Sequence, residues 1–488
     1  MSTMAAEKRR SINIHDILKT YEKELTELNS ALWDLAEIRF EEKESAGRMT
    51  DLLERHGFQV ERGLGGLPTA YRAVCGSGHP VIGLLAEYDA LDGLSQQADR
   101  TEPAARPETN HGHGCGHHLL GTGILGAALI LKEYTDRNPG SGTVIVFGCP
   151  AEEGGSGKTY MARAGVFDGI DAALTWHPST INASMTGSLL ANCQAKFRFR
   201  GKSSHAGAAP QKGRSALDAL ELMNVGVNYL REHMEMTDRI HYAITNTGGV
   251  SPNVVQAEAE VLYLIRSRDN DSVRELYRRV VNIARGAALM TGTSVETEFD
   301  KACSNVVPSD VLGRLMYEKM LETGVPEYTE EEKEYIRKFR AVVGDEAADH
   351  DMGLLPEFDM ETRYELCRTH PMGDFILPFE PQDVVETASS DMGDVSQIAP
   401  LIQLQCACFC LGTQPHSWVL TAQGKSSYAV KGMLFAAETL AAGAVELMEN
   451  PDLLREAVEE NVKRRGGKPY RCPIPEDVVP PVFRKNRS

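Results

Sequence analysis

The sequence predicts an α/β protein built from two domains. Its 488 residues exceed what one ordinary hydrophobic core contains, so two domains are expected. Apolar strand patterns alternate with helical patterns in the N-terminal and C-terminal parts of the chain. Between them, strands with alternating apolar residues and two helices predict a compact α+β insert that can fold as a unit. We therefore expect residues 1–187 and 301–488 to form one domain and residues 188–300 to form the second.

The N-terminal part predicts helices and strands in alternation. Leu and Ile recur at helical spacing over residues 14–44, and a second helix is expected over 46–56, up to the break at Gly57. The elements that follow are expected as a buried strand over Val81–Ala86, a loop over 92–112, an apolar helix over about 119–137, and strands over Thr143–Gly148 and Ala172–Thr175.

The insert and the C-terminal part are predicted in the same way. The insert should contain strands over Cys193–Arg200, Ile240–Thr247, Glu258–Ile265 and Ser294–Phe299, and helices over Ser215–His233 and Ser272–Thr291. After it we expect a solvated acidic helix and loop over Glu327–Asp351, a strand over Ile402–Leu411 and a closing helix over Ala429–Met448. Cys406, Cys408 and Cys410 alternate in that strand, which predicts three buried residues on one face rather than a zinc site.

Composition excludes several classes of partner. With 51 basic and 69 acidic residues, the net charge of -18 argues against binding to nucleic acid or to an anionic membrane. The longest apolar run, Leu119–Leu131, is too short and too rich in glycine to span a bilayer. Ten cysteines without framework spacing, and no apolar signal region, predict reduced thiols in a cytoplasmic protein.

The stretch His111–His118 concentrates potential metal ligands. It holds four of the 14 histidines and one of the ten cysteines, interleaved with glycines that let the backbone wrap closely. Imidazole and thiolate suit zinc-like ions, and Cys115 and His117, two positions apart in an extended loop, can turn toward one point. A glycine-rich turn with surface histidines would share this composition. Only further ligand-type residues elsewhere in the chain can distinguish a metal site from such a turn.

Two nearby motifs resemble nucleotide-binding signatures without their context. Gly121–Gly126 matches the spacing G-x-G-x-x-G, but no strand precedes it and its glycines fall inside a helix, so we interpret them as close-packing positions. Gly157-Lys158-Thr159 ends like a phosphate-binding loop, but the first glycine of that motif would stand at position 152, which is glutamate. A carboxylate there would repel phosphate, so we exclude this site as well.

Two further candidates follow predicted strands. Glu152 and Glu153 lie on a glycine-rich turn after the strand Thr143–Gly148, and neighbouring side chains point to opposite sides. One carboxylate can therefore face a metal while the other faces the water that the metal activates. His177 follows the next strand, although a lone histidine there is more often structural than a ligand.

These residues together resemble a known family. Cys115, His117, the Glu152-Glu153 pair, His177 and His416, in this order and with the insert between the last two, are similar to the aminoacylase and carboxypeptidase family of dinuclear metallopeptidases. The resemblance covers nearly the whole chain. It is strongest to the amidohydrolase branch, through the stretches His-Gly-Cys-Gly-His, Pro-Ala-Glu-Glu, Asn-Thr-Gly-Gly-Val-Ser-Pro-Asn-Val-Val and Asp-Met-Gly-Asp-Val-Ser.

The resemblance implies a fold and a set of roles. It implies a zinc-peptidase-like catalytic domain, with a mixed sheet flanked by helices, and an inserted lid and dimerisation domain. Glu152 would be the general base, and His205 would reach from the neighbouring subunit to steady the reacting carbonyl. Asn253 and Arg266 would hold the carboxylate of the substrate. Two divalent ions, Mn²⁺ or Zn²⁺, would be held by Cys115, His117, Glu153, His177 and His416.

The implied reaction is hydrolysis of the amide bond of an N-acyl or aminobenzoyl amino acid by a homodimer or by a heteromer with a related subunit. A dipeptidase of the same family is the alternative of the same chemistry, and an assisting subunit of a heteromeric hydrolase is the alternative from another class. Two departures from the family pattern stand out. His118 replaces the usual Asp or Asn after the metal histidine, and Ser417-Trp418 follows His416 where many relatives have Ser-Pro.

Overall fold

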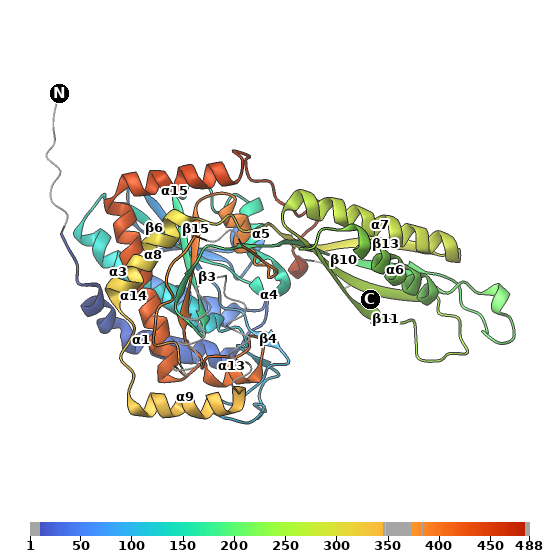
Figure 1. Ribbon diagram of the computed structural model, residues 1–488, viewed down its shortest axis with the longest axis horizontal. Helices are drawn as coiled ribbons and strands as arrows, with labels where there is room; N and C mark the ends of the chain where they lie inside the picture. The colour runs from blue at the N-terminus through green and yellow to red at the C-terminus, as the bar shows by residue number, and fades with distance from the viewer. Residues whose placement is uncertain (1–9, 345–346, 348–369, 371, 382–383, 484–488) are drawn as a thin grey trace. The chain divides into compact units, whose positions relative to one another are not determined.

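The computed structural model describes residues 10–344, 347, 370, 372–381 and 384–483, which divide into two compact units (Figure 1). The first unit lies within Met1–Gly187, Val307–Val384 and Val395–Tyr470, and the second within Ser188–Val306, Val385–Asp394 and Arg471–Ser488. The second unit therefore contains the predicted insert together with two segments from later in the chain. Its continuous part extends past residue 300 because the last strand stays paired up to Cys303.

The first unit contains a seven-stranded mixed sheet in the order β1-β2-β6-β3-β7-β15-β8. The central strands β6, β3, β7 and β15 run parallel, while β1, β2 and β8 pair antiparallel toward the two edges. The strands are β1 (Gln59–Arg62), β2 (Tyr71–Ser77), β3 (Val81–Ala86), β6 (Gly142–Gly148), β7 (Ala172–Ser179), β8 (Ala183–Met185) and β15 (Leu401–Ala407), with a separate pair formed by β4 (Leu91–Asp92) and β5 (His111–Gly112).

Helices flank this sheet. Helix α3 packs on β2, β3, β6 and β7, helices α1 and α14 pack on α3, and α8 packs on β8 and β15. The helical segments are α1 (Ile14–Leu35), α2 (Lys43–Arg55), η1 (Leu64–Gly66), α3 (His117–Arg137), α4 (Glu152–Gly155), α5 (Gly157–Arg163), α8 (Asp310–Thr323), α9 (Glu330–Val343), α12 (Met392–Ser396, at the chain boundary of the two units), α13 (Trp418–Gln423), α14 (Ser427–Glu449) and α15 (Pro451–Arg464). The predicted α/β fold with a mixed sheet flanked by helices is confirmed.

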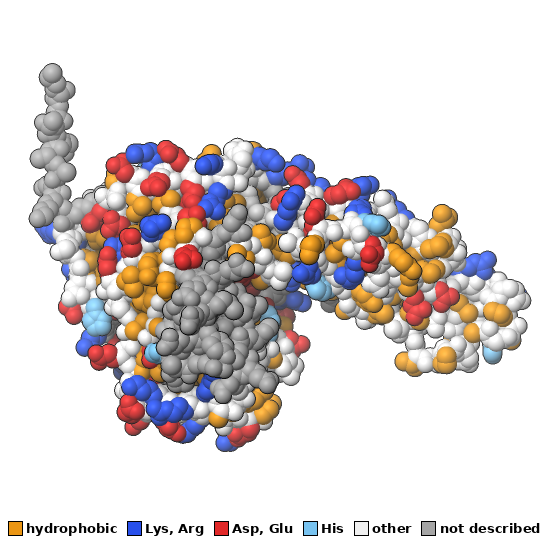
Figure 2. All heavy atoms as spheres, in the orientation of Figure 1, with side chains coloured by type: hydrophobic (Ala, Val, Ile, Leu, Met, Phe, Trp, Pro, Cys, Tyr) orange, Lys and Arg blue, Asp and Glu red, His pale blue; other side chains and the backbone are white. Residues whose placement is uncertain are grey.

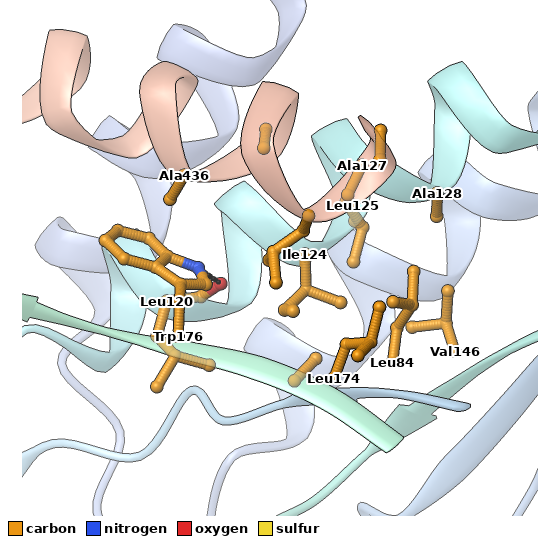
Figure 3. Close-up of a cluster of buried hydrophobic side chains, with 14 of the residues drawn as sticks. Leu84, Leu120, Ile124, Leu125, Ala127, Ala128, Val146, Leu174, Trp176 and Ala436 are labelled. Carbon is orange, nitrogen blue, oxygen red and sulfur yellow. Dashed lines mark hydrogen bonds between the residues drawn. The ribbon is translucent and has the colours of Figure 1, made fainter. Parts of the chain in front are cut away.

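Helix α3 is the central helix of the core. Figure 3 shows its side chains between Leu84, Val146 and Leu174 of the sheet and Ala436 of α14. Each large apolar side chain buried in this way contributes about 1.5–3 kcal/mol. Trp176 of β7 also donates a hydrogen bond from Nε1 to the carbonyl oxygen of Leu120, at 3.0 Å. These contacts fix the first turn of α3 against β7.

The glycines of α3 are close-packing positions, as interpreted from the sequence. A Cβ atom on Gly121 would lie 2.6 Å from the carbonyl oxygen of Glu87, and one on Gly123 would lie 2.8 Å from the ring of Trp176. A Cβ on Gly126 would lie 3.0 Å from another Cβ atom. The glycines therefore let the helix approach the sheet and α14 closely.

The second unit is an α+β unit with a four-stranded antiparallel sheet in the order β11-β12-β10-β13. Two helices pack on this sheet and on each other, and their first turns are capped by Ser215 and Asp269. The elements are β9 (Ser188–Leu189), β10 (Ala191–Arg200), η2 (Pro210–Lys212), α6 (Ala216–Leu230), η3 (Arg231–His233), β11 (Arg239–Asn246), β12 (Glu258–Ser267), α7 (Asn270–Thr291), β13 (Ser294–Cys303), β14 (Val385–Glu386, paired with β9) and η4 (Pro481–Phe483).

One predicted helix is shorter than expected. The helix predicted over residues 14–44 ends at Leu35, because Ala36 adopts a left-handed backbone conformation (φ 44°, ψ 47°) and donates its N–H to the carbonyl oxygen of Leu32. Such a stop is usually marked by glycine or asparagine, so an alanine gives no signal in the sequence. The second helix then begins at Lys43, three residues before the predicted start.

The prediction for the three alternating cysteines is partly wrong. Strand β15 ends at Ala407, so Cys408 and Cys410 do not share a strand face with Cys406. The N–H of Cys408 donates instead to the carbonyl oxygen of Ser179, and that of Cys410 donates to the side chain of Gln423. All three side chains are nevertheless buried, as expected.

The acidic stretch after residue 327 forms helix α9, whose start is closed by a capping box between Thr329 and Glu332. The remainder of that predicted segment, up to Asp351, falls almost wholly outside the described residues. Among the helices that the structure describes, none combines the length and apolar character needed to cross a membrane.

Candidate metal and active centre

The predicted metal residues of the first unit come from four segments that end at one edge of the sheet. The carboxyl ends of neighbouring parallel strands meet at one edge, where α/β proteins build their sites. Segment α4 follows β6, His177 lies near the carboxyl end of β7, and the loop after β15 leads to His416. Cys115 and His117 stand at the start of α3, which packs on β7. Sheet topology therefore brings these segments together.

Cys115, His117 and His177 form the first group of potential ligands. The Sγ atom of Cys115 lies 3.4 Å from Nε2 of His177, and one ligand atom from each of the three residues lies within 4.8 Å of the others. The Nδ1 atom of His177 donates to the carbonyl oxygen of Pro178, at 2.9 Å. The lone pair of His177 is therefore on Nε2, the atom that faces the thiol.

Cys115 also belongs to a second group, with Glu153 and His416. The Oε1 atom of Glu153 lies 3.2 Å from Nε2 of His416. His416 holds a left-handed backbone conformation (φ 55°), and its N–H donates to the carbonyl oxygen of Gly114 at 2.8 Å. A non-glycine residue rarely adopts this conformation, so the hydrogen bond to the ligand-bearing loop helps to hold it.

His117 joins a third group, with Glu87 and Glu152. Its Nε2 atom lies 3.3 Å from Oε2 of Glu87, and its Nδ1 atom donates to Oδ1 of Asp89 at 2.9 Å. The other carboxylate oxygen of Asp89 accepts the backbone N–H of Glu153 at 2.8 Å. Glu152 and Glu153 thus join different groups, as their adjacent positions on a turn predicted.

The charges of these groups perturb one another. Burial raises the pKa of the Cys115 thiol, but the charges of His117 and His177 together outweigh burial and bring this pKa down to about 6. Burial likewise raises the pKa of Glu153, yet contact with His416 and the charge of His117 bring it to about 2. The close approach of Cys115, and then of Glu153, raises the pKa of His416 to about 10. The cluster therefore favours thiolate and carboxylate, which are the forms that bind cations.

The donor atoms of this cluster fit divalent cations. Nε2 of His117 and Oε1 of Glu153 are both buried, and neither has a hydrogen-bond partner among the described residues. Buried polar atoms without partners are uncommon, and here both belong to ligand-type side chains. Thiolate, imidazole and carboxylate together suit borderline ions such as Zn²⁺. Because Cys115 and His117 each belong to two groups, the groups describe adjacent positions rather than separate sites.

A buried carboxyl group supports the turn that carries the glutamate pair. Ala151, directly before Glu152, has a left-handed backbone conformation (φ 60°, ψ 41°), and its N–H donates to Oε1 of Glu42 at 2.7 Å. Glu42 also accepts a hydrogen bond from Thr69. Burial, followed by the charge of Asp89, raises the pKa of Glu42 to about 8. The hydrogen bond to Glu42 thus stabilises a left-handed backbone conformation at Ala151 that would otherwise be costly.

Sequence comparison places this centre in a known group of enzymes. Residues 83–473 match the profile of peptidase family M20/M25/M40. The chain belongs to this family. It is 45% identical over 470 residues to the B subunit of p-aminobenzoyl-glutamate hydrolase of Escherichia coli (strain K12), covering 96% of this chain and 98% of that protein. It is also 33% identical over 299 residues to the Xaa-Arg dipeptidase of Mus musculus, covering 58% and 65%.

Solved structures share the fold of this M20 chain. An aminobenzoyl-glutamate utilization protein from Klebsiella pneumoniae aligns with a TM-score of 0.56 at 17% identity, covering 89% of this chain and 98% of that one. A dinuclear metal-binding peptidase of the M20 family from Bacillus subtilis aligns with a TM-score of 0.55 at 17% identity, covering 88% and 99%. The predicted family and the predicted reaction class, metal-dependent hydrolysis of an amide bond, are confirmed.

The other three predicted site residues of this M20 chain lie in the second unit. His205 is exposed and forms a β-bridge with Val254, and the N–H of Ala206 donates to the carbonyl oxygen of Asn253 at 2.9 Å. Nδ1 of His205 accepts the N–H groups of Gly207 and Ala208, at 3.2 and 3.1 Å. The ring proton of a neutral His205 is therefore on Nε2.

Arg266 lies at the opposite end of the second unit's sheet. Strand β12 begins at Glu258, on the side of Asn253, and Arg266 stands eight residues further along it. At about 3.3 Å per residue this separation is roughly 26 Å. Nη1 of Arg266 donates to the carbonyl oxygen of Thr387 at 3.0 Å, whereas its buried Nε has no hydrogen-bond partner among the described residues. The structure thus brings His205 and Asn253 together, but not Arg266.

His118 takes no part in the three ligand groups. It is fully buried, and its Nε2 donates to the carbonyl oxygen of Gly424 at 2.9 Å. Burial lowers the pKa of His118 to about 3, so the ring is neutral. The unusual residue after the metal-motif histidine therefore joins the start of α3 to the segment that follows α13.

Four buried residues around the centre were not singled out from the sequence. Glu87 and Asp89 directly follow the predicted strand Val81–Ala86, and two carboxylates at a strand end are a signal that could have found them. Lys158 belongs to the excluded phosphate-loop motif, and Glu42 gives no signal at all. Their positions depend on contacts between distant segments.

Proposed function

We propose that this M20 chain cleaves the amide bond of an N-acyl or aminobenzoyl amino acid of the p-aminobenzoyl-glutamate type. The observation that carries the proposal is the convergence of thiol, imidazole and carboxylate groups on adjacent positions in the first unit. The similarity over 96% of the chain to a protein named for p-aminobenzoyl-glutamate hydrolysis supports the substrate class. A dipeptidase reaction has weaker support, because the related dipeptidase aligns over only 58% of the chain.

The proposed centre holds two divalent ions, Mn²⁺ or Zn²⁺, on Cys115, His117, Glu153, His177 and His416. The shared position of Cys115 in two ligand groups, and the buried atoms of His117 and Glu153 that make no hydrogen bond among the described residues, support this assignment. When bound, such ions polarise a carbonyl group and lower the pKa of a water molecule to near neutrality.

Glu152 acts as the general base in this proposal. Its carboxylate belongs to the group with His117 and Glu87, while its neighbour Glu153 belongs to the group with His416. Glu152 can therefore accept a proton from the attacking water and pass it to the leaving amine, while Glu153 remains a ligand.

The second unit supplies the groups that hold the substrate. His205 donates from Nε2 to the carbonyl oxygen as negative charge develops there, because its Nδ1 already accepts two backbone N–H groups. Arg266 and Asn253 recognise the substrate carboxylate. The partnerless Nε of Arg266 supports this role, because a guanidinium edge grips a carboxylate with parallel hydrogen bonds.

We further propose that the site is completed by a second copy of the chain. Arg266 lies near the end of β12, whereas His205 is bridged to Val254, which precedes the start of that strand, so the two residues are roughly 26 Å or more apart at about 3.3 Å per residue. One small substrate cannot contact both residues of the same chain. Two copies joined through their second units would let His205 and Asn253 of one chain serve the substrate whose carboxylate Arg266 of the other chain binds.

The surface around β11 and α6 fits such a dimer contact. Strand β11 is at the edge of its sheet and is exposed from His241 to Asn246. Figure 2 shows hydrophobic side chains at the surface of the second unit around α6 and α7. The exposed large hydrophobic residues of α6 are Leu222, Val225 and Tyr229, which are 38%, 50% and 72% exposed. An exposed edge strand is a template for strand addition by a second copy, and exposed apolar side chains of the same unit can add to the contact.

The partner in this dimer is a second copy of the chain, and a related protein is the alternative. The chain is 29% identical over 240 residues to the A subunit of p-aminobenzoyl-glutamate hydrolase of Escherichia coli (strain K12), which keeps the heteromer as a testable arrangement. A cytoplasmic location is part of this proposal, because the spacing of the ten cysteines matches no disulfide framework.

The reaction is tested with the purified chain, with no other protein present, against p-aminobenzoyl-glutamate, a series of N-acyl amino acids and Xaa-Arg dipeptides, with Mn²⁺ or Zn²⁺ added. We expect hydrolysis of the aminobenzoyl substrate and about two ions per chain by elemental analysis. Cys115→Ala should lose metal and activity together. Full metal content in that variant would refute the ligand assignment, and activity confined to dipeptides would refute the substrate class.

The dimeric arrangement is tested by complementation. Chains with His205→Ala and chains with Glu152→Gln should each be inactive, but a mixed dimer contains one intact composite site. Mixing them under conditions where the dimers exchange chains should restore part of the activity, while each variant mixed with itself should remain inactive. Demonstrated exchange without recovery would rule out the contribution of His205 across the interface.

A further inference from the structure

Lys158 is a fully buried lysine beside the proposed metal centre. Its side chain is 0% exposed, and its Nζ lies 2.6 Å from Oε1 of Glu87, which is itself 2% exposed. Lysine is almost never fully buried unless it is paired, since removing an ammonium group from water is costly. Lys158 belongs to α5, just after the turn that carries Glu152 and Glu153. The buried ammonium group of Lys158 therefore needs a physical explanation in terms of its surroundings.

The two oxygens of Glu87 face different partners. Oε1 contacts Lys158, whereas Oε2 lies 3.3 Å from Nε2 of His117, the imidazole atom that has no hydrogen-bond partner among the described residues. One carboxylate oxygen of Glu87 also lies within 4.8 Å of a carboxylate oxygen of Glu152. A carboxylate in this position could bind a cation through both oxygens if both were available. Lys158 occupies one of them.

We propose that Lys158 is a positioning residue that serves as a built-in cation of the centre. It holds Glu87 beside His117, and it would leave only one oxygen of Glu87 free to face a cation bound by His117, so that this carboxylate would not close the centre to water and substrate. This inference rests on the proposed metal centre. An open position is what separates a catalytic metal site from a closed structural one.

The surrounding charges explain why such a cation is needed. Five anionic or potentially anionic side chains, Glu87, Asp89, Cys115, Glu152 and Glu153, lie in this part of the first unit. Without a metal their mutual repulsion opposes folding; His416 offsets it at Glu153, and the fixed ammonium of Lys158 offsets it at Glu87. With a metal, Lys158 and the metal compete for the charge of Glu87. Removal of Lys158 should therefore weaken the metal-free chain and strengthen metal binding.

The test compares the wild type with Lys158→Met, Glu87→Gln, the double variant K158M/E87Q and the control Lys132→Met. Lys132 forms an ion pair on the surface of α3, with Asp136 at 2.6 Å. The first readout is the Tm in EDTA, and the second is the shift of Tm on addition of Zn²⁺ or Mn²⁺. The third is the metal affinity measured by competition with a chelator.

We expect the Tm of K158M in EDTA to fall by on the order of 10 °C, because breaking a buried pair leaves a charge unpaired. The double variant, which lacks both charges, should recover most of this loss. Metal should raise the Tm of K158M more than that of the wild type, with an affinity about tenfold higher, as two cations competing for one carboxylate imply. K132M should match the wild type in both respects.

Two outcomes overturn the inference alone. One is a metal-induced shift in K158M that equals the wild-type shift, and the other is a double variant that is no more stable in EDTA than K158M. If K158M does not fold in EDTA, K158M/E87Q must fold there, and its failure would also overturn the pairing. A wild-type chain without any metal-induced shift would instead overturn the proposed metal centre, and this inference with it.

Discussion

Asp89 orients two proposed ligands at once, so its replacement by asparagine tests the geometry of the centre. One carboxylate oxygen accepts from Nδ1 of His117 at 2.9 Å, and the other accepts the backbone N–H of Glu153 at 2.8 Å. Asp89 is 1% exposed, so water cannot take over either hydrogen bond. Asparagine has nearly the same shape but only one acceptor oxygen, and its amide N–H₂ would face the second donor.

The size of the effect of Asp89→Asn on metal binding follows from the number of acceptor oxygens that is lost. One buried donor loses its acceptor in Asp89→Asn, which costs about 1–3 kcal/mol. If the cost is expressed in metal binding, the affinity falls by about 5-fold to 150-fold. This range includes the loss of about 10-fold to 100-fold that is typical when the partner of a metal-bound histidine is removed.

The assay is competition for Zn²⁺ or Mn²⁺ between the protein and a chromophoric chelator, with kcat/KM measured in parallel. A matched control is Asp51→Asn, which removes an equal charge from a side chain that is 66% exposed and 3.7 Å from Arg62. The control should leave metal affinity unchanged. An affinity of Asp89→Asn within twofold of the wild type would refute the role of Asp89 in orienting His117 and Glu153.

Three further outcomes are expected. Glu152→Gln should keep its metal but lose roughly 10² to 10⁴ in kcat, and a near wild-type kcat would place the general base elsewhere. Arg266→Ala should reduce kcat/KM far more for substrates with a free carboxylate than for the corresponding amides, and equal losses would contradict its carboxylate role. Gly123→Ala should lower the free energy of unfolding by about 1–3 kcal/mol, because its Cβ would lie 2.8 Å from the ring of Trp176. Gly47→Ala, where a Cβ meets nothing within 4 Å, is the control and should not destabilise.

The residues of the candidate centre could be predicted because they lie in short local motifs. Cys115 and His117 share one glycine-rich loop, and Glu152 and Glu153 are neighbours. The sheet then places these motifs at one edge, because several of them follow neighbouring parallel strands. The strands and helices of the insert were predicted to within a few residues, because their apolar periodicity is clear and Ser215 and Asp269 cap the two helices.

The buried residues that hold the ligand-bearing segments in place could not be predicted in the same way. Lys158 meets Glu87, and Glu42 meets Ala151, only after distant segments have folded together. The left-handed backbone at Ala36 and Ala151 had no marker either, since such positions are usually recognised by glycine. Tertiary contacts stabilise these conformations, and a local pattern carries no information about them.

The separation of His205 and Arg266 within the second unit has a consequence at the level of the cell. In the proposed dimer, each active site draws on two molecules, so its formation is a second-order event. Activity per molecule then falls on dilution below the dissociation constant of the dimer, although every chain remains folded. The amount of protein that a cell makes would set how fast each copy works as well as how many copies are present.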